Sequence, residues 1–188
     1  LKAEDGRPFG VQWTLFRQAL APENRQVSLE RAEKKASERV WQSRQLWMAH
    51  AALSTPHEHF FAERFARGMT LPDNRGQAGV DTAPFSAWID NWTLEAAGKN
   101  TGFDQLVVNA SGEGFGYRLE LIAEGPLVRH GQGGFSQKSA DGQGSMYYSQ
   151  PFFRVTGEVM LDGESLEVSG RAWLDREWSS QLLGPSQR

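Results

Sequence analysis

The dipeptide Asp162-Gly163 lies between two long runs in which apolar and polar residues alternate, and no other feature of the sequence restricts the fold as strongly. An Asp-Gly pair in this setting is typical of a two-residue type I′ turn, because both turn positions need a positive φ angle. Such a turn fixes the register of the strands that it connects. Counting outward from it predicts pairs whose small and apolar side chains share one face: Val159 with Leu166, Gly157 with Val168, Val155 with Gly170 and Phe153 with Ala172.

Most of the remaining 188-residue chain shows the same period of two, or short aromatic and β-branched runs bounded by turn residues. We therefore predict a mostly β fold, an antiparallel β-barrel or strongly curved sandwich of about eight to ten strands. Strands are expected at residues 9–17, 46–54, 59–65, 85–95, 103–110, 115–123, 147–161 and 164–178. The exception is residues 22–45, where helix-forming residues predict at most one short helix near residues 28–39.

Composition excludes several classes of function. The net charge of −3 offers no basic surface for a phosphate backbone, so nucleic acid is not an expected partner. The absence of cysteine excludes disulfides and thiolate metal sites. No apolar run approaches the roughly 20 residues that a membrane-spanning helix needs. The chain also begins at Leu1 rather than Met, and we expect that a segment preceded it.

The turn register also gathers residues capable of chemistry at the far end of the hairpin. It places Phe152 beside Trp173, Gln150 beside Asp175, and Tyr148 beside Glu177, all on one face. Pro151 can force a bulge at this point and shift these pairs by one residue. The cluster as a whole is therefore a firmer prediction than its individual pairs.

The two carboxylates of this cluster admit two interpretations. Asp175 and Glu177 lie two residues apart on one strand face, about 6.5 to 7 Å along the backbone. An apolar wall such as Trp173 would raise the pKa of one carboxyl group, which would then act as a general acid while the other stays ionised. Alternatively, both carboxylates form structural ion pairs with Arg154, Arg171 or Arg176.

The histidines offer a weaker signal. His50 stands within an apolar strand, where it is either a core histidine with a hydrogen-bond partner or a proton-transfer residue that faces a lumen. His57 and His59 share a strand face, yet spacing fixes no third ligand, so we predict no metal site.

The chain contains 7 tryptophans and 11 phenylalanines. Trp88 and Trp92, four residues apart, would share a face of one long strand. They either pack in the core or line a cavity for an apolar small molecule, as closed barrels of about eight strands can hold one ligand.

Seven separated blocks resemble the AttH-like family, which is related to the carotenoid 1,2-hydratases (hydroxyneurosporene synthases). These blocks are DGRPFGVQWTLFR, LWMAHAALS, HFFAERFARG, PFSAWIDNW, GGFSQKS, MYYSQPFFRVTGEV and GRAWLDREWSSQ. They occur in order from Asp5 to Gln181, so the resemblance assigns residues 5–181 to one domain and residues 182–188 to a linker or tail.

The resemblance implies a lipocalin-like domain, the first of two in a longer protein that is exported to the bacterial periplasm or envelope. It implies hydration or hydrolysis of an apolar isoprenoid-like or acyl substrate by acid/base chemistry without a cofactor. The alternative that it implies is lipophilic ligand binding as an accessory to an envelope ABC-type transporter. The candidate catalytic residues are Asp175, Glu177, His50 and Tyr148, and the candidate binding residues are Trp173, Trp178, Phe152, Gln150, Trp88 and Trp92.

The C-terminal residues predict a further partner. Trp178, Leu182 and Leu183 have no apolar partner in the pattern of the chain itself. Because an exposed apolar patch favours association, we expect a second barrel domain or a homodimer partner near this end.

Overall fold

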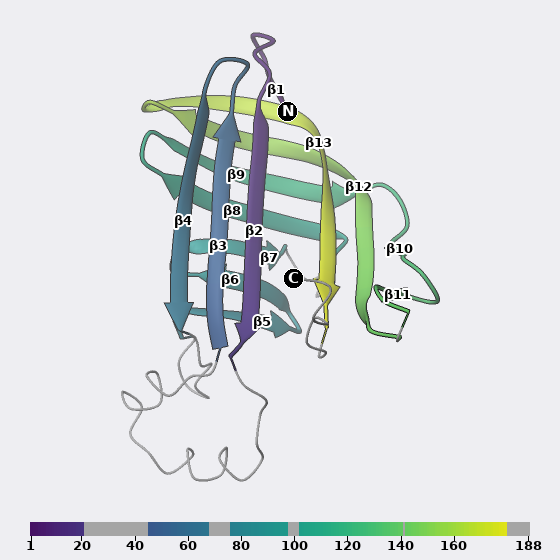
Figure 1. Ribbon diagram of the computed structural model, residues 1–188. Coiled ribbons are helices and arrows are strands. Elements are labelled where there is room, and N and C mark those ends of the chain that lie inside the picture. Colours follow the sequence, from purple (N-terminus) through teal and green to yellow (C-terminus); the bar gives the residue numbers. More distant parts are fainter. Residues whose placement is uncertain (21–44, 68–75, 98–101, 141, 180–188) are drawn as a thin grey trace.

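The computed structural model describes residues 1–20, 45–67, 76–97, 102–140 and 142–179. These residues form thirteen strands in two antiparallel sheets and no helix (Figure 1). The prediction of a mostly β fold is confirmed. The short helix expected near residues 28–39 lies outside the described residues.

The larger sheet follows the order β1-β13-β12-β9-β8-β7-β6-β5, and β10 and β11 also pair with β12. Its strands are β1 (Lys2–Ala3), β5 (Ala78–Thr82), β6 (Phe85–Ile89), β7 (Trp92–Ala96), β8 (Gln105–Gly112), β9 (Phe115–Ala123), β10 (Val128–Arg129), β11 (Phe135–Gln137), β12 (Gly144–Leu161) and β13 (Glu164–Trp178). The smaller sheet, of order β2-β3-β4, contains β2 (Gly10–Ala19), β3 (Gln45–Ser54) and β4 (His59–Arg67).

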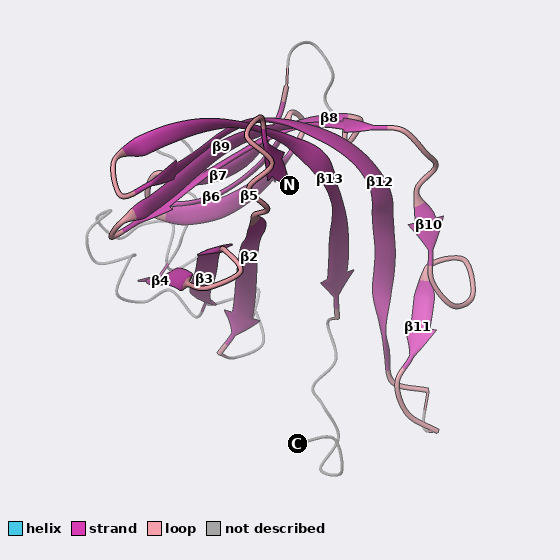
Figure 2. Ribbon diagram, turned by 90° about the horizontal axis from the view of Figure 1, so that it is seen from above, coloured by secondary structure: helices cyan, strands magenta, loops and turns pink. Residues whose placement is uncertain are grey.

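The smaller sheet covers one face of the larger sheet, and its strands run across those behind them (Figure 1). The long strands β12 and β13 bend, so that their far halves form a wall beside β2 (Figure 2). Among the described residues no ladder of hydrogen bonds joins β2 to β13, so the two sheets form a curved, lipocalin-like sandwich rather than a closed barrel.

The core lies between the two sheets and follows the alternation of each strand. In β3, Trp47, Ala49, Ala51 and Leu53 are buried on the inner face. In β12 and β9 the inner positions include Phe153, Val155, Val159, Leu119 and Leu121, all buried. This pattern is the one expected when one face of each antiparallel sheet packs on the core.

The register predicted from the Asp162-Gly163 turn is confirmed. Both turn residues have positive φ angles, 50° and 85°. Val159 pairs with Leu166, Gly157 with Val168, Val155 with Gly170 and Phe153 with Ala172. The turn therefore sets the register of the longest hairpin in the sheet.

Gly157 occupies a position in β12 that a larger residue would strain. Its φ angle is 142°, and a Cβ atom there would lie 2.3 Å from the backbone oxygen of Arg118 in β9. We expect Gly157→Ala to lower the free energy of unfolding by about 1 to 3 kcal/mol, because neighbouring backbone must move. Urea unfolding measures this effect, with Gly102→Ala as control, since a Cβ at Gly102 meets no atom within 4 Å. Equal losses in both variants would contradict the strain at Gly157.

The prediction that residues 85–95 form one strand was wrong, because they form two. The chain reverses at Asp90, whose φ angle is 51°, and forms the hairpin of β6 and β7. Asp and Asn adopt this left-handed conformation more readily than other non-glycine residues, so Asp90-Asn91 serves as the turn. Trp88 and Trp92 consequently lie on opposite faces of the sheet, because Trp92 pairs with Ile89 while Trp88 pairs with Thr93.

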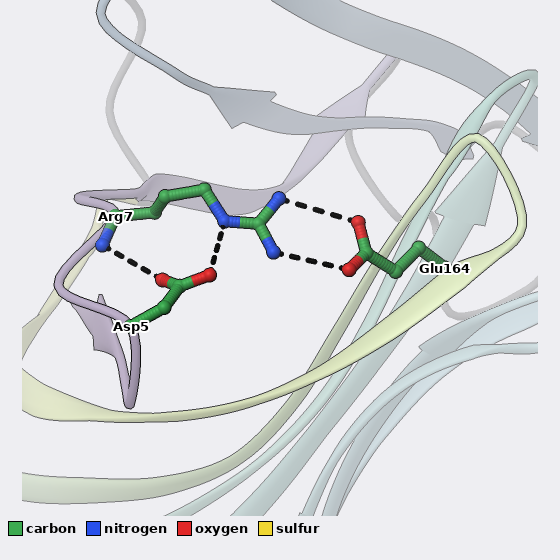
Figure 3. Close-up of polar contacts among 3 residues, drawn as sticks. All are labelled: Asp5, Arg7 and Glu164. Carbon is green, nitrogen blue, oxygen red and sulfur yellow. Dashed lines mark hydrogen bonds and ion pairs between the residues drawn. The ribbon is translucent and has the colours of Figure 1, made fainter.

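A charged cluster joins the N-terminal turn to the tip of the β12–β13 hairpin (Figure 3). Arg7 Nε donates to Asp5 at 2.6 Å, and its two terminal nitrogens donate to Glu164 at 3.2 and 3.1 Å. The Asp5 pKa is lowered by the hydrogen bond from the backbone N–H of Arg7 and by the one from the Arg7 side chain. The bidentate contact joins the turn that precedes β2 to the first residue of β13 at one end of the sandwich.

Candidate functional site

A groove of about 800 Å³ opens between β2 and the far half of β13. It is lined by every residue of the runs 9–15 and 171–176. Successive residues of a strand point to opposite faces, so two unbroken runs mean that the groove lies along the edges of these strands. The groove thus lies between two strand edges, those of β2 and β13, that do not pair with each other in the described part of the chain.

The floor of the groove is the apolar interior of the sandwich. It comprises Val80, Phe85, Ala87 and Leu94 from β5 to β7, together with Phe103 before β8. Trp13 and Leu15 of β2 and Ala172 and Leu174 of β13 contribute the apolar walls. The volume and the apolar lining are typical of pockets for lipophilic small molecules.

The cation Arg176 lies beside this apolar floor. The guanidinium of Arg176 is 5.6 Å from the ring centroid of Phe85, 5.7 Å from that of Phe103 and 5.6 Å from that of Trp178. Arg176 also donates to the hydroxyl of Tyr148 at 3.3 Å. Burial raises the pKa of Tyr148, which keeps the phenol protonated at neutral pH.

A bulge in β12 redistributes the residues predicted to cluster here. The register shifts between Gln150 and Phe153, so Pro151 and Phe152 oppose Trp173. Beyond the bulge, Ser149 pairs with Asp175. The predicted pairs of Gln150 with Asp175 and of Tyr148 with Glu177 were therefore wrong by one residue, the shift that Pro151 made possible.

Because a shift of one residue exchanges the faces, the predicted cluster is divided. Tyr148 and Gln150 face the interior with Leu174 and Arg176. Trp173, Asp175 and Glu177 alternate with these inner residues and lie on the outer face.

Asp175 and Glu177 each have hydrogen-bond partners on that outer face. Asp175 accepts from the Ser149 hydroxyl, and Ser149 Oγ lies 2.7 Å from Nε2 of His130. The Ser149 hydroxyl has a single proton, which it donates to Asp175. Its oxygen therefore accepts in the contact with His130, and Nε2 of His130 is the donor. Asp175 is also one of the residues that line the groove.

Glu177 lies further from the groove, on the same outer face. It accepts from the hydroxyl of Ser145 and forms an ion pair with Lys138, whose Nζ is 2.9 Å from Glu177 Oε1. These hydrogen bonds lower the pKa of Glu177, so the group is ionised at neutral pH. An ionised carboxylate is suited to a base or an ion pair rather than to a proton donor.

The predicted aromatic and amide binding residues occupy different environments. Trp173 is 72% exposed at the groove rim, and Phe152 projects from the bulge beside Gly125. Trp178, which was expected to lack a partner, contacts Tyr148 edge-to-face with the ring centroids 5.8 Å apart. Gln150 is buried and donates to the backbone oxygen of Gly125.

Three other predicted residues lie away from the groove. His50 is on the outer face of β3, where its Nε2 is 3.3 Å from Glu63, so the expectation that it is a core histidine or faces a lumen was wrong. Trp92 is fully buried in the core, and Trp88 packs against Gly79 on the opposite face of the sheet. The structure therefore does not bring His50, Trp88 or Trp92 to Asp175.

Sequence reasoning found Trp173 and Asp175 but missed the other residues that form the groove. Trp13, Phe85, Phe103 and Leu174 come from separate strands and loops, and no local pattern connects them. Arg176 was considered only as an ion-pair partner of the carboxylates. Arg176 follows the apolar residues Ala172 and Leu174 at intervals of two along the strand. This alternation could have indicated that Arg176 shares their inward-facing side.

Within the described residues, no group of three or more His, Cys, Asp or Glu side chains is arranged to hold a metal ion. The same residues also contain no helix that is long and apolar enough to cross a membrane.

Comparisons with known proteins identify the family. A family model described as AttH-like matches residues 1–188. An AttH protein from Nitrosomonas europaea has a similar structure, with a TM-score of 0.75 and 29% sequence identity, over 98% of this chain and 50% of that one. No curated protein matches the sequence.

Kievitone hydratase from Nectria haematococca is a second structural neighbour, with a TM-score of 0.66 and 12% identity. The similarity covers 96% of this chain and 45% of that one, and at this identity it shows the fold alone. The chain spans about half the length of both neighbours. Since the family model covers its whole length, the chain belongs to the AttH-like family.

Proposed function

We propose that this domain takes up an elongated lipophilic molecule, isoprenoid-like or acyl, in the groove between β2 and β13. The observation that carries the proposal is the groove itself, about 800 Å³ of space with an apolar floor that is continuous with the core. Burying an acyl or isoprenoid chain there removes apolar surface from water on both sides, worth about 0.8 kcal/mol for each buried CH₂ group.

The first test of this proposal uses the purified chain without added ligand. Solvent extraction and native mass spectrometry should recover a lipophilic molecule bound in about equimolar amount. Titration with a polyene methyl ester, which fluoresces in apolar surroundings, should show one saturable site. Protein that carries no lipid and does not enhance the fluorescence of the ester would contradict ligand uptake.

A second candidate function is hydration of an isolated C=C bond in the bound molecule. The observation that favours it is Asp175, a residue that lines the groove and whose carboxyl group is linked through Ser149 to His130. This chain of hydrogen bonds can deliver a proton to Asp175, which would protonate the alkene and leave a carbocation for water to capture. Nearby aromatic rings would stabilise the cation. The structural neighbour kievitone hydratase is by name a hydratase, which agrees with this class of reaction.

Asp175→Asn should abolish this hydration and leave ligand affinity unchanged, because the amide keeps its size and loses the transferable proton. Incubation with an isoprenoid in H₂¹⁸O, followed by mass spectrometry, detects one added water. Glu177→Gln is the matched control and should keep most activity, since Glu177 is ionised beside Lys138. Unchanged turnover in Asp175→Asn, or loss only in Glu177→Gln, would remove Asp175 from the mechanism.

The other family expectations stay predictions. They are export to the periplasm or envelope, an accessory role beside an ABC-type transporter, and a second barrel or homodimer partner near the C-terminal end. Half of each neighbouring structure has no counterpart in this chain, which is consistent with a further domain in a longer protein.

A further inference from the structure

Among the residues that the structure describes, few hydrogen-bond acceptors surround the guanidinium of Arg176. A guanidinium has five N–H groups, and it is normally paired with carboxylates or with several oxygen acceptors when it leaves bulk water. Arg176 is half-buried, and its hydrogen bond within the described chain is the donation to Tyr148 at 3.3 Å. The salt bridges among the described residues do not include it. The aromatic rings around it attract a cation but offer no lone pairs.

The carboxylates near Arg176 are directed elsewhere. Asp175, which also lines the groove, lies on the opposite face of β13 and accepts from Ser149. Glu177 lies on that same outer face and is paired with Lys138. The positive charge of Arg176 is therefore unmatched at the inner wall of the groove, as far as the described residues extend.

We propose that Arg176 binds the anionic head of the lipophilic ligand, and that the preferred ligand is an amphiphile with a carboxylate, such as a long-chain or isoprenoid acid. This inference rests on the proposed uptake of a lipophilic molecule and specifies its chemical class. The apolar chain would lie along Phe85, Phe103 and Leu174, and the carboxylate would accept hydrogen bonds from the guanidinium.

Tyr148 supports the same assignment. Its hydroxyl accepts from Arg176 and still has its own proton to donate. Because burial raises the pKa of Tyr148, this proton is retained at neutral pH. Arg176 and Tyr148 together present donors, and no anionic acceptor, to a carboxylate.

The test compares two probes that differ only in the head group. A fluorescent polyene fatty acid and its methyl ester share the apolar chain, while only the acid is an anion at pH 7. We expect the wild-type chain to bind the acid about tenfold or more tightly than the ester. A hydrogen bond to a charged group contributes about 1.5 to 3 kcal/mol, and about 1.4 kcal/mol corresponds to a tenfold change in affinity. Arg176→Met should abolish this preference, because it removes the positive charge that distinguishes the acid from the ester.

Two further variants keep the result interpretable. Arg176→Lys retains the charge and should preserve part of the preference for the acid. Arg118→Met removes a positive charge from the exposed face of β9 and should preserve all of it. Binding of the ester by Arg176→Met shows that the groove is intact.

The outcomes separate this inference from the proposed function. Equal affinity of the wild type for acid and ester overturns the role of Arg176 and leaves uptake of a lipophilic molecule standing. The same holds if the preference for the acid survives in Arg176→Met. Binding of neither probe by the wild type overturns both.

Discussion

Replacing Trp92 by alanine is expected to lower the free energy of unfolding by about 3 to 5 kcal/mol, the largest single loss that we anticipate for this domain. The Trp92 side chain is 0% exposed at the centre of the core. Its Nε1 donates to the backbone oxygen of Ser111 at 2.9 Å, and the guanidinium of Arg64 lies 4.2 Å from its ring centroid. Alanine would leave a cavity in the core. It would also leave the Ser111 carbonyl without its hydrogen-bond donor and the Arg64 guanidinium without the aromatic ring that it contacts.

Chemical unfolding followed by circular dichroism measures this loss. The matched control is Trp173→Ala, which removes the same side chain from an exposed position on β13 and should change stability by no more than about 0.5 kcal/mol. Similar losses in the two variants would contradict the placement of Trp92 in the core and of Trp173 outside it.

Ala172→Trp is expected to weaken binding of a polyene methyl ester by more than about tenfold, because a buried ligand chain gains roughly 0.8 kcal/mol per CH₂ group. Ala172 lies on the inner face of β13 and lines the groove. An indole at this position would fill the space that we assign to the ligand chain. Fluorescence titration of the ester gives the affinity directly.

Thr156→Trp provides the comparison for this variant. Thr156 is exposed on β12, and the substitution adds the same ring outside the groove. It should leave the affinity unchanged. If Ala172→Trp folds and binds the ester as tightly as the wild type, the ligand does not occupy the groove.

The fold was largely predictable because its strongest signals are local. Asp162-Gly163 fixes two φ angles, and these fix the register of β12 and β13 out to Phe153 and Ala172. The strand predicted at 115–123 has the bounds of β9, since alternation is unbroken there. The turn at Asp90 was missed because it contains no glycine or proline, and so β6 and β7 resembled one strand.

The candidate site was harder to predict, for a physical reason. Its predicted pairs depended on counting past Pro151, and one inserted residue exchanges every inner and outer side chain beyond it. Tyr148 and Arg176 thereby face the interior while Asp175 faces out. The groove exists because the edges of β2 and β13 do not pair with each other. The alternation of residues within one strand does not reveal how far that strand lies from another.

The measurement that most directly tests the account is photolabelling with a neutral alkyl ester that carries a diazirine on its chain, followed by residue-level mass spectrometry. Ligand in the groove predicts label on Trp13, Phe103 and Leu174, and suppression of the label by excess polyene ester. The competing apolar surface is the outer face of β4, where Phe61 is 68% and Phe65 is 56% exposed. Label confined to Phe61 and Phe65, with none on the groove residues, would contradict ligand binding between β2 and β13.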